Sequence, residues 1–132
     1  MSEEKVAIVR RIYEEWGRGN FRAGTELFEP HTLLVLRPDF LDAGAYIGLD
    51  GIGRYMRAFL GAWEDLVIEA IEFIDAGDSI VVGVRQRGTG RGSGAPIEQT
   101  YFQLWTFRGG TVLRIENILR RGEALEAAGL QP

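Results

Sequence analysis

The sequence contains no cysteine and only one histidine, His31. Without cysteine, the chain cannot form disulfides, use a catalytic thiol or bind zinc or iron–sulfur clusters through thiolates. A single histidine also excludes metal sites built from several imidazoles. We therefore expect no metal site, and nothing in the sequence implies a cofactor.

Long apolar runs and an excess of positive charge are missing as well. No segment approaches the roughly 20 apolar residues of a membrane span, and the start MSEEKVAIVRR has no apolar core of a signal peptide. The formal net charge is −4, which argues against binding to nucleic acid. We expect a soluble cytoplasmic protein without membrane contacts. Its 132 residues suit a single domain spanning residues 1–132.

Apolar residues recur at three- and four-residue spacing in three segments, which predicts helices. The first covers residues 3–16 after an acid-rich start. The second is short, covers residues 20–29 and is ended by Pro30. The third begins with Asp50 as its cap and extends to Trp63, with its apolar side chains on one face.

Strand patterns fill most of the remaining chain. Thr32 to Leu36 is a short apolar run, and residues 38–44 form an irregular loop rich in turn residues. From Leu66 onward the apolar period becomes two, and this predicts four consecutive strands joined by short turns. Residues 122–129 are expected to form a short helix or an ordered tail. The order predicts an α+β fold whose curved antiparallel sheet wraps around three helices from the N-terminal half, as a cone with one open end.

The last two strands, residues 97–121, form a predicted hairpin with a Gly-Gly turn, and alternation gives it two faces. One face is apolar and carries two amides, and we expect it to line a pocket. It comprises Tyr101, Gln103, Trp105, Phe107, Leu113, Ile115, Asn117 and Leu119. The other face mixes apolar and charged residues, which suits a homodimer interface. It comprises Phe102, Leu104, Arg114, Glu116, Ile118 and Arg120.

Several polar residues are candidates for chemistry. Asp39, preferred to Asp42, follows a strand at the expected mouth of the cone and could act as a general base, or it is a surface acid in a loop. His31 could move protons near neutral pH, or it is a polar residue at a helix exit. Arg85 could pair with an anionic ligand if its face is internal, and the alternation leaves that face open.

The two amides need hydrogen-bond partners, since an unpaired buried amide costs about 1–3 kcal/mol. Gln103 and Asn117 could bind a ligand carbonyl, each other or a trapped water. Tyrosine and tryptophan also need partners for their polar atoms, which favours the rim of a cavity for many of the aromatic residues. The aromatic residues predicted to bind substrate are Tyr13, Trp16, Tyr55, Phe59, Trp63, Tyr101 and Trp105.

Three stretches carry a family resemblance: RRIYEEWGRGNFRAGTELF, YIGLDGI and LWTFRGGTVLRIE. With the order of elements, they resemble the NTF2-like superfamily and, within it, the SnoaL-like group that includes polyketide cyclases. The resemblance implies an internal apolar pocket, pairing of two subunits through the outer sheet face, and activities that range over isomerases, cyclases and dehydratases.

The residues of the related ketosteroid isomerases do not carry over well. The place of their helix tyrosine falls on Ile12, next to Tyr13, and the place of their protonated aspartate is taken by Gln103. Their base falls on Leu36 or on Asp39, depending on the end from which positions are counted. Since glutamine cannot titrate, the sequence argues against steroid isomerisation of that type.

Our leading hypothesis is a homodimer that binds a small apolar or cyclic, polyketide-like molecule in an internal pocket. Its chemistry would be cofactor-independent acid/base isomerisation, cyclisation or elimination. The alternatives are a non-catalytic scaffold whose cone is simply packed, and a carrier or sensor that binds without turnover.

Overall fold

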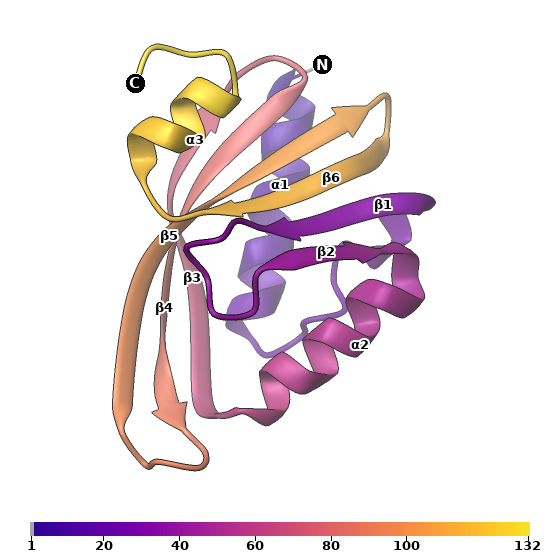
Figure 1. Ribbon diagram of the computed structural model, residues 1–132. Helices are drawn as coiled ribbons and strands as arrows, with labels where there is room; N and C mark the ends of the chain where they lie inside the picture. The colour runs from indigo at the N-terminus through magenta and orange to yellow at the C-terminus, as the bar shows by residue number, and fades with distance from the viewer. Residues whose placement is uncertain (1) are drawn as a thin grey trace.

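The computed structural model describes residues 2–132 and combines a strongly curved sheet with helices on both of its faces (Figure 1). The elements in chain order are α1 (Ser2–Gly17), the 3-10 helix η1 (Thr25–Leu27), β1 (Phe28–Leu36), β2 (Gly44–Ile47), α2 (Gly48–Gly61), β3 (Trp63–Asp75), β4 (Ser79–Gly90), β5 (Pro96–Arg108), β6 (Thr111–Ile118) and α3 (Arg121–Ala127). The predicted α+β class is confirmed.

The six strands form one sheet in the order β2-β1-β6-β5-β4-β3. All neighbours are antiparallel except β1 and β6, which are parallel. The expectation of a wholly antiparallel sheet is wrong for this pair. β1 is followed by β2 and α2, so the chain returns to β1 only with its last strand, and that strand runs in the same direction.

The inner face of the sheet, defined here as the face that α1 and α2 cover, carries the main core. Val9, Ile12 and Tyr13 of α1 are buried against it, as the helical spacing predicts. α2 contributes Ile52 to the same core and packs Tyr55 partly against it. In Figure 1, α1 passes behind the strands while α2 lies beside β1 and β2. The turn end of the β4–β5 hairpin extends beyond the two helices, and residues 96–98 there are exposed.

The predicted second helix is wrong, because its residues form only a turn and the single 3-10 turn η1. Gly24 lies just before η1 at φ +95°, and a Cβ there would come within 3.0–3.3 Å of the Ile12 side chain. A continuous α-helix cannot pass through that conformation. Phe28 then begins β1, and Pro30 lies where the β1–β6 register shifts, so its missing N–H interrupts no regular ladder.

The start of α2 depends on Gly48, which has φ +68°. A Cβ at this position would lie 2.9 Å from the carbonyl oxygen of Pro30 in β1, so the helix start can approach the strand this closely only with glycine. Asp50 lies inside the first turn and does not cap the helix, contrary to the prediction. The helix also ends before Trp63, which is the first residue of β3.

The hairpin of β5 and β6 is confirmed, with Gln103 opposite Asn117 and Trp105 opposite Ile115. A register shift after Thr106 alters the end near the turn. As a result Val112 is fully buried in the inner core where Leu113 was expected. An extra residue in one strand reverses the facing of the residues beyond it, and alternation alone does not reveal such a bulge.

The outer face of the sheet is partly covered by α3, which lies in front of the strands in Figure 1. Phe102 and Leu104 are 8% and 5% exposed and pack with Ala124 of α3. They are therefore not free for a partner subunit, contrary to the prediction, because the chain's own last helix covers this apolar surface. Glu116 is also buried, and it pairs with Arg114 on the same strand at 3.3 Å.

Within residues 2–132, no helix combines the length and the apolar character needed to cross a membrane.

Candidate functional site

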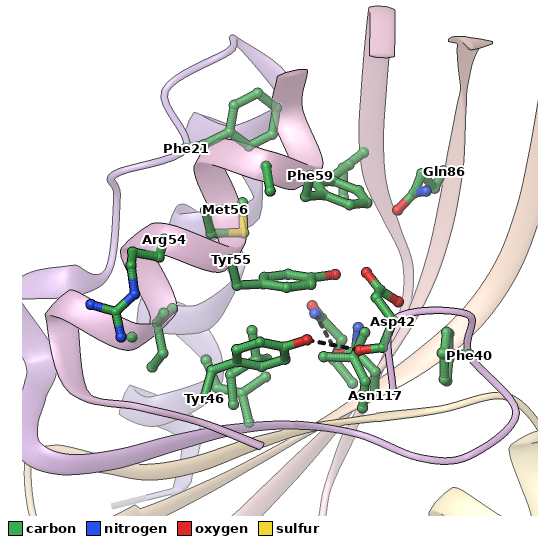
Figure 2. A pocket seen from close by; sticks show the side chains of 18 of the residues that line it. Phe21, Phe40, Asp42, Tyr46, Arg54, Tyr55, Met56, Phe59, Gln86 and Asn117 are labelled. Atoms are coloured by element: carbon green, nitrogen blue, oxygen red, sulfur yellow. Dashed lines mark hydrogen bonds between the residues drawn. The ribbon is translucent and has the colours of Figure 1, made fainter. Parts of the chain in front are cut away.

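A cavity of about 1080 Å³ lies between α2, the loop of residues 37–43 and the inner face of the sheet (Figure 2). Strand alternation positions its floor, because every second residue of β1, β4, β5 and β6 points to this side. Most of the lining is apolar. The apolar lining residues include Phe21, Phe28, Leu34, Leu36, Phe40, Ile52, Met56, Ile68 and Ile115.

A row of aromatic rings forms one wall. Tyr55 and Phe59 are four residues apart on α2, so they share a helix face, and Tyr46 and Trp63 extend the row at its two ends. Successive ring centroids from Tyr46 to Trp63 are 4.7, 5.8 and 6.0 Å apart. This wall offers flat apolar surface to a ligand.

Polar side chains form the opposite wall, in a hydrogen-bonded chain that begins in the core. Trp105 Nε1 donates to the Tyr13 hydroxyl at 2.9 Å, and that hydroxyl donates to Gln103 Oε1. Gln103 Nε2 donates to Asn117 Oδ1 at 3.0 Å. We call these four residues the relay. Only Gln103 and Asn117 reach the cavity, while Tyr13 and Trp105 lie behind them.

A third buried amide, Gln86 of β4, also faces the cavity. Its Oε1 accepts a hydrogen bond of 2.9 Å from the Tyr101 hydroxyl. The sequence analysis did not select Gln86. The signal was present, because Gln86 continues the alternation of Ile80, Val82 and Val84, all of which are buried on the inner face.

Asn117 and Gln86 each keep an NH₂ group free for the cavity. In residues 2–132, every side-chain nitrogen or oxygen that is shielded from solvent has a hydrogen-bond partner. Asn117 Nδ2 and Gln86 Nε2 have no hydrogen-bond partner in that part of the chain, so they must retain accessible surface. Since both residues line the cavity, that surface opens into it.

Two acids lie at the loop side of the cavity. Asp39 pairs with Arg120 at 3.6 Å. The Asp42 carboxylate points toward the Tyr55 hydroxyl in Figure 2, and its backbone carbonyl accepts a 2.9 Å hydrogen bond from Tyr46. Asp42 forms no ion pair within residues 2–132. It is therefore the acid that remains available to a ligand.

The loop that carries these acids is fixed at its start by Arg37. Its Nε donates to the buried Glu116 carboxylate at 2.8 Å. A charge-assisted bond to a buried carboxylate holds its partner more firmly than an exposed ion pair does. Glu116, predicted as part of a dimer interface, thus anchors the loop of the cavity.

Residues 9–115 match the family model described as the SnoaL-like domain. The chain belongs to the SnoaL-like family. No curated protein matches this SnoaL-like chain significantly.

Solved structures confirm the NTF2-like fold of this SnoaL-like domain. An NTF2-like protein from Burkholderia thailandensis is 25% identical, with a TM-score of 0.79 over 96% of this chain and 97% of that one. A putative SnoaL-like polyketide cyclase from Jannaschia sp. is 19% identical, with a TM-score of 0.77 over 99% and 95%. A protein with a ketosteroid isomerase-like fold from Catenulispora acidiphila is 19% identical, with a TM-score of 0.71 over 93% and 92%.

Burial perturbs three tyrosines of the SnoaL-like domain. Burial raises the pKa of Tyr13 well above its usual value, although the hydrogen bond from Trp105 opposes this shift. Burial and the nearby Asp42 carboxylate raise the pKa of Tyr55, and the same two causes raise that of Tyr101. These hydroxyls therefore stay protonated over the whole physiological range and serve as hydrogen-bond donors.

Most residues predicted to bind substrate lie on the cavity, and binding by them stays a prediction. They are Trp16, Tyr55, Phe59, Trp63, Tyr101, Gln103 and Asn117, and the predicted base Asp39 lies there too. Tyr13 and Trp105 are packed behind the wall. His31 is exposed on β1 and does not line the cavity.

The role predicted for Arg85 as a ligand-binding residue has no support in this cavity. Arg85 opposes Glu69 and Thr100 in the sheet, on the outer face, and its guanidinium pairs with Glu69 at 2.7 Å. Its neighbours Val84 and Gln86 point inward, so alternation places Arg85 outward. Within residues 2–132, no group of three or more His, Cys, Asp or Glu side chains is arranged to hold a metal ion.

Proposed function

We propose that this SnoaL-like domain binds a small, largely apolar, cyclic molecule of the polyketide type in the cavity and exchanges a proton with it. One observation carries the proposal: an apolar cavity of about 1080 Å³ has two free amide NH₂ groups on one wall and, at its loop side, a carboxylate without an ion pair among the described residues. The volume lies just above the roughly 300–1000 Å³ typical of small-molecule sites. Few convergent polar groups in an apolar lining are also typical of such sites.

The polar groups suit proton transfer next to a carbonyl. The ligand oxygen would accept hydrogen bonds from Asn117 Nδ2, and the Asp42 carboxylate would take a proton from the carbon beside that carbonyl. The electron pair of the C–H bond then moves to the oxygen as an enolate, which the amide donors stabilise. If a C=C bond of the ligand is conjugated with the enolate, return of the proton from Asp42 to the far carbon of that dienolate completes an isomerisation. Alternatively, the enolate carbon attacks a second carbonyl, whose oxygen becomes an alkoxide and takes the proton from Asp42, and the ring closes.

Asp42 takes the role that the sequence analysis gave to Asp39. The Arg120 guanidinium already occupies one oxygen of Asp39, and this favours a structural role in fastening α3 to the loop. Asp42 points toward Tyr55 within the cavity. A base must lie within hydrogen-bond reach of the proton that it removes, and Asp42 meets this requirement better.

Binding without chemistry is the second candidate, and Gln103 favours it. This amide occupies the inner wall where a titratable acid would support catalysis, and an amide can neither give up nor take a proton. The second candidate predicts tight binding of the same kind of ligand with no proton exchange.

One experiment separates the two candidates. 1-Indanone, a bicyclic ketone, is incubated with the protein in D₂O, and NMR measures both its binding and the deuterium that enters the carbon beside its carbonyl. We expect catalysed exchange that Asp42→Asn lowers at least about 100-fold with little change in binding. Asp39→Asn is the matched control and keeps the exchange. Binding without catalysed exchange would support the second candidate, and absence of binding by any cyclic ketone would contradict both.

A further inference from the structure

The hydrogen bonds of the relay have only one possible direction, and this direction begins at Trp105. The side chain is 0% exposed, and its indole N–H lies 2.9 Å from the Tyr13 oxygen. An indole N–H donates and cannot accept. The Tyr13 oxygen must therefore accept, and the single proton of its hydroxyl is left for another partner.

That proton fixes the orientation of both amides. The Tyr13 hydroxyl contacts Gln103, so it donates to the carbonyl oxygen of that amide. Gln103 then turns its NH₂ group toward Asn117, whose oxygen accepts at 3.0 Å. Asn117 in turn has only its NH₂ group left for the cavity. Each amide orientation thus follows from a residue that lies deeper in the core.

We propose that the relay makes the cavity selective for a hydrogen-bond acceptor, such as a carbonyl or enolate oxygen, and against a ligand that offers only a donor. Trp105 and Tyr13 are the positioning residues for this specificity, although neither lines the cavity. The inference rests on the proposed function, because it assumes that a ligand enters this cavity.

Gln86 gives the same polarity from a second strand. Its oxygen is engaged by the Tyr101 hydroxyl, so its NH₂ group faces the cavity. Asn117 and Gln86 therefore both present a hydrogen-bond donor to the cavity. A ligand donor placed against them would lose its hydrogen bonds to water without replacement, and such unpaired groups are costly.

The relay also predicts what happens without the indole N–H. In Trp105→Phe, the Tyr13 oxygen no longer has to accept from the core, so it can accept from the NH₂ group of Gln103. Gln103 can then turn its oxygen toward Asn117, and Asn117 can turn its own oxygen into the cavity. The polarity of the wall becomes adjustable while every lining residue stays the same.

A matched set of bicyclic probes tests this inference. 1-Indanone offers only an acceptor, indole offers only a donor, and indane offers neither, while all three have nearly the same shape. Kd is measured for each by NMR titration with the full chain. The set is repeated in Asp42→Ala, because the Asp42 carboxylate could accept from indole and hide the effect of the wall.

We expect the unaltered chain to bind 1-indanone at least about tenfold more tightly than indole in both backgrounds, since each unpaired donor is costly. In Trp105→Phe the ratio of the two Kd values should fall to within about threefold, while indane binds as before. Tyr13→Phe, which removes the hydroxyl that links core and amide, should also lower the ratio and serves if Trp105→Phe does not fold.

The outcomes distinguish a failure of the relay inference from a failure of the proposed function. If all three probes bind equally well, or if indole binds best, the inference is overturned and ligand binding stands. If the preference for 1-indanone persists in a folded Trp105→Phe and in Tyr13→Phe, the relay does not set the polarity. If none of the probes binds, the proposed function fails together with the inference.

Discussion

Replacing Tyr13 with phenylalanine is the sharpest test of the relay as a source of stability. The change removes one hydroxyl and keeps the ring, which packs against Trp16 with a centroid distance of 4.7 Å. The hydroxyl has two partners, Trp105 Nε1 and Gln103 Oε1, and both belong to residues that are at most 7% exposed. The variant therefore leaves two buried polar atoms without a partner and barely changes the apolar packing.

The magnitude follows from the cost of each unpaired atom. A buried donor or acceptor that loses its partner costs about 1–3 kcal/mol, so two should cost about 2–4 kcal/mol after partial relaxation toward the cavity. A domain of this size has a total stability of about 5–15 kcal/mol. With about 3–4 °C per kcal/mol for a chain of this length, the expected fall in Tm is roughly 6–16 °C.

Urea unfolding followed by tryptophan fluorescence measures the change, and calorimetry gives Tm. Tyr46→Phe is the matched control, because it removes a hydroxyl whose partner is the exposed carbonyl of Asp42. We expect it to cost less than about 1 kcal/mol. The double variant Tyr13→Phe/Gln103→Met should be more stable than the two single changes predict by at least about 1 kcal/mol, since both partners are then gone. A cost below about 0.5 kcal/mol for Tyr13→Phe would refute the reasoning.

Three further predictions follow from the same structure. First, the raised pKa values of Tyr13 and Tyr101 mean that only the unfolded chain releases these protons above about pH 10, so stability should fall with rising pH by up to about 3 kcal/mol per unit. Urea midpoints and tyrosinate absorbance check this, and ionisation of either tyrosine before unfolding would contradict it. Second, Arg91 donates to the carbonyls of Gly61 and Trp63 at 3.0 and 2.9 Å. Arg91→Met should therefore lower the free energy of unfolding by about 1 kcal/mol, measured in urea. An unchanged urea midpoint would show that these two hydrogen bonds do not stabilise the fold. Third, the homodimer stays a prediction, and with Phe102 and Leu104 covered it would use Ile71, which is 52% exposed on the outer face. Light scattering should find a dimer that Ile71→Lys converts to a monomer, and a monomeric unaltered chain would contradict it.

The polar wall of the cavity could be predicted from the sequence because strand alternation is strictly local. Gln103 and Asn117 fall opposite one another once the Gly-Gly turn sets the register of the hairpin. The same alternation places Gln86 inward and Arg85 outward. For Arg85 the sequence did not show which face is internal, and the pairing of β4 with β5 decides it. Alternation therefore predicts the content of a face well, and it fails where a bulge, as beside Thr106, shifts the register.

The segment from Phe21 to Phe28 misled the helix prediction for a physical reason. Its aromatic residues have helical spacing, and both Phe21 and Phe28 do pack against the main core. The left-handed conformation of Gly24 breaks the segment, and it follows from close packing against Ile12 of α1. A tertiary contact of this kind leaves no periodic signal. β2 escaped prediction similarly, because four mostly exposed residues carry no alternation.

The choice between Asp39 and Asp42 could not be made from the sequence either. Both acids lie in one loop, and their roles differ through remote partners. Arg120, some 80 positions along the chain, pairs with Asp39, while Tyr46 and Tyr55 accompany Asp42. Loop conformation and long-range charge pairing decide this choice, and neither follows from local spacing.

The sheet and the loop thus contribute different groups to the cavity: the strands carry the amide donors, and the loop carries the acid. The relay is built into paired strands and a core tryptophan, so the polarity of the inner wall is fixed by parts of the chain that cannot move without loss of the fold. The acid lies on a loop that is fastened by the Arg37–Glu116 pair and can be altered without disturbing the strands. Under the proposed function and the relay inference, a change of base, or its loss, would leave the cavity selective for the same ligand oxygen and would alter only the reaction of the bound ligand. This separation gives a physical reason why one fold can serve both as an enzyme and as a carrier.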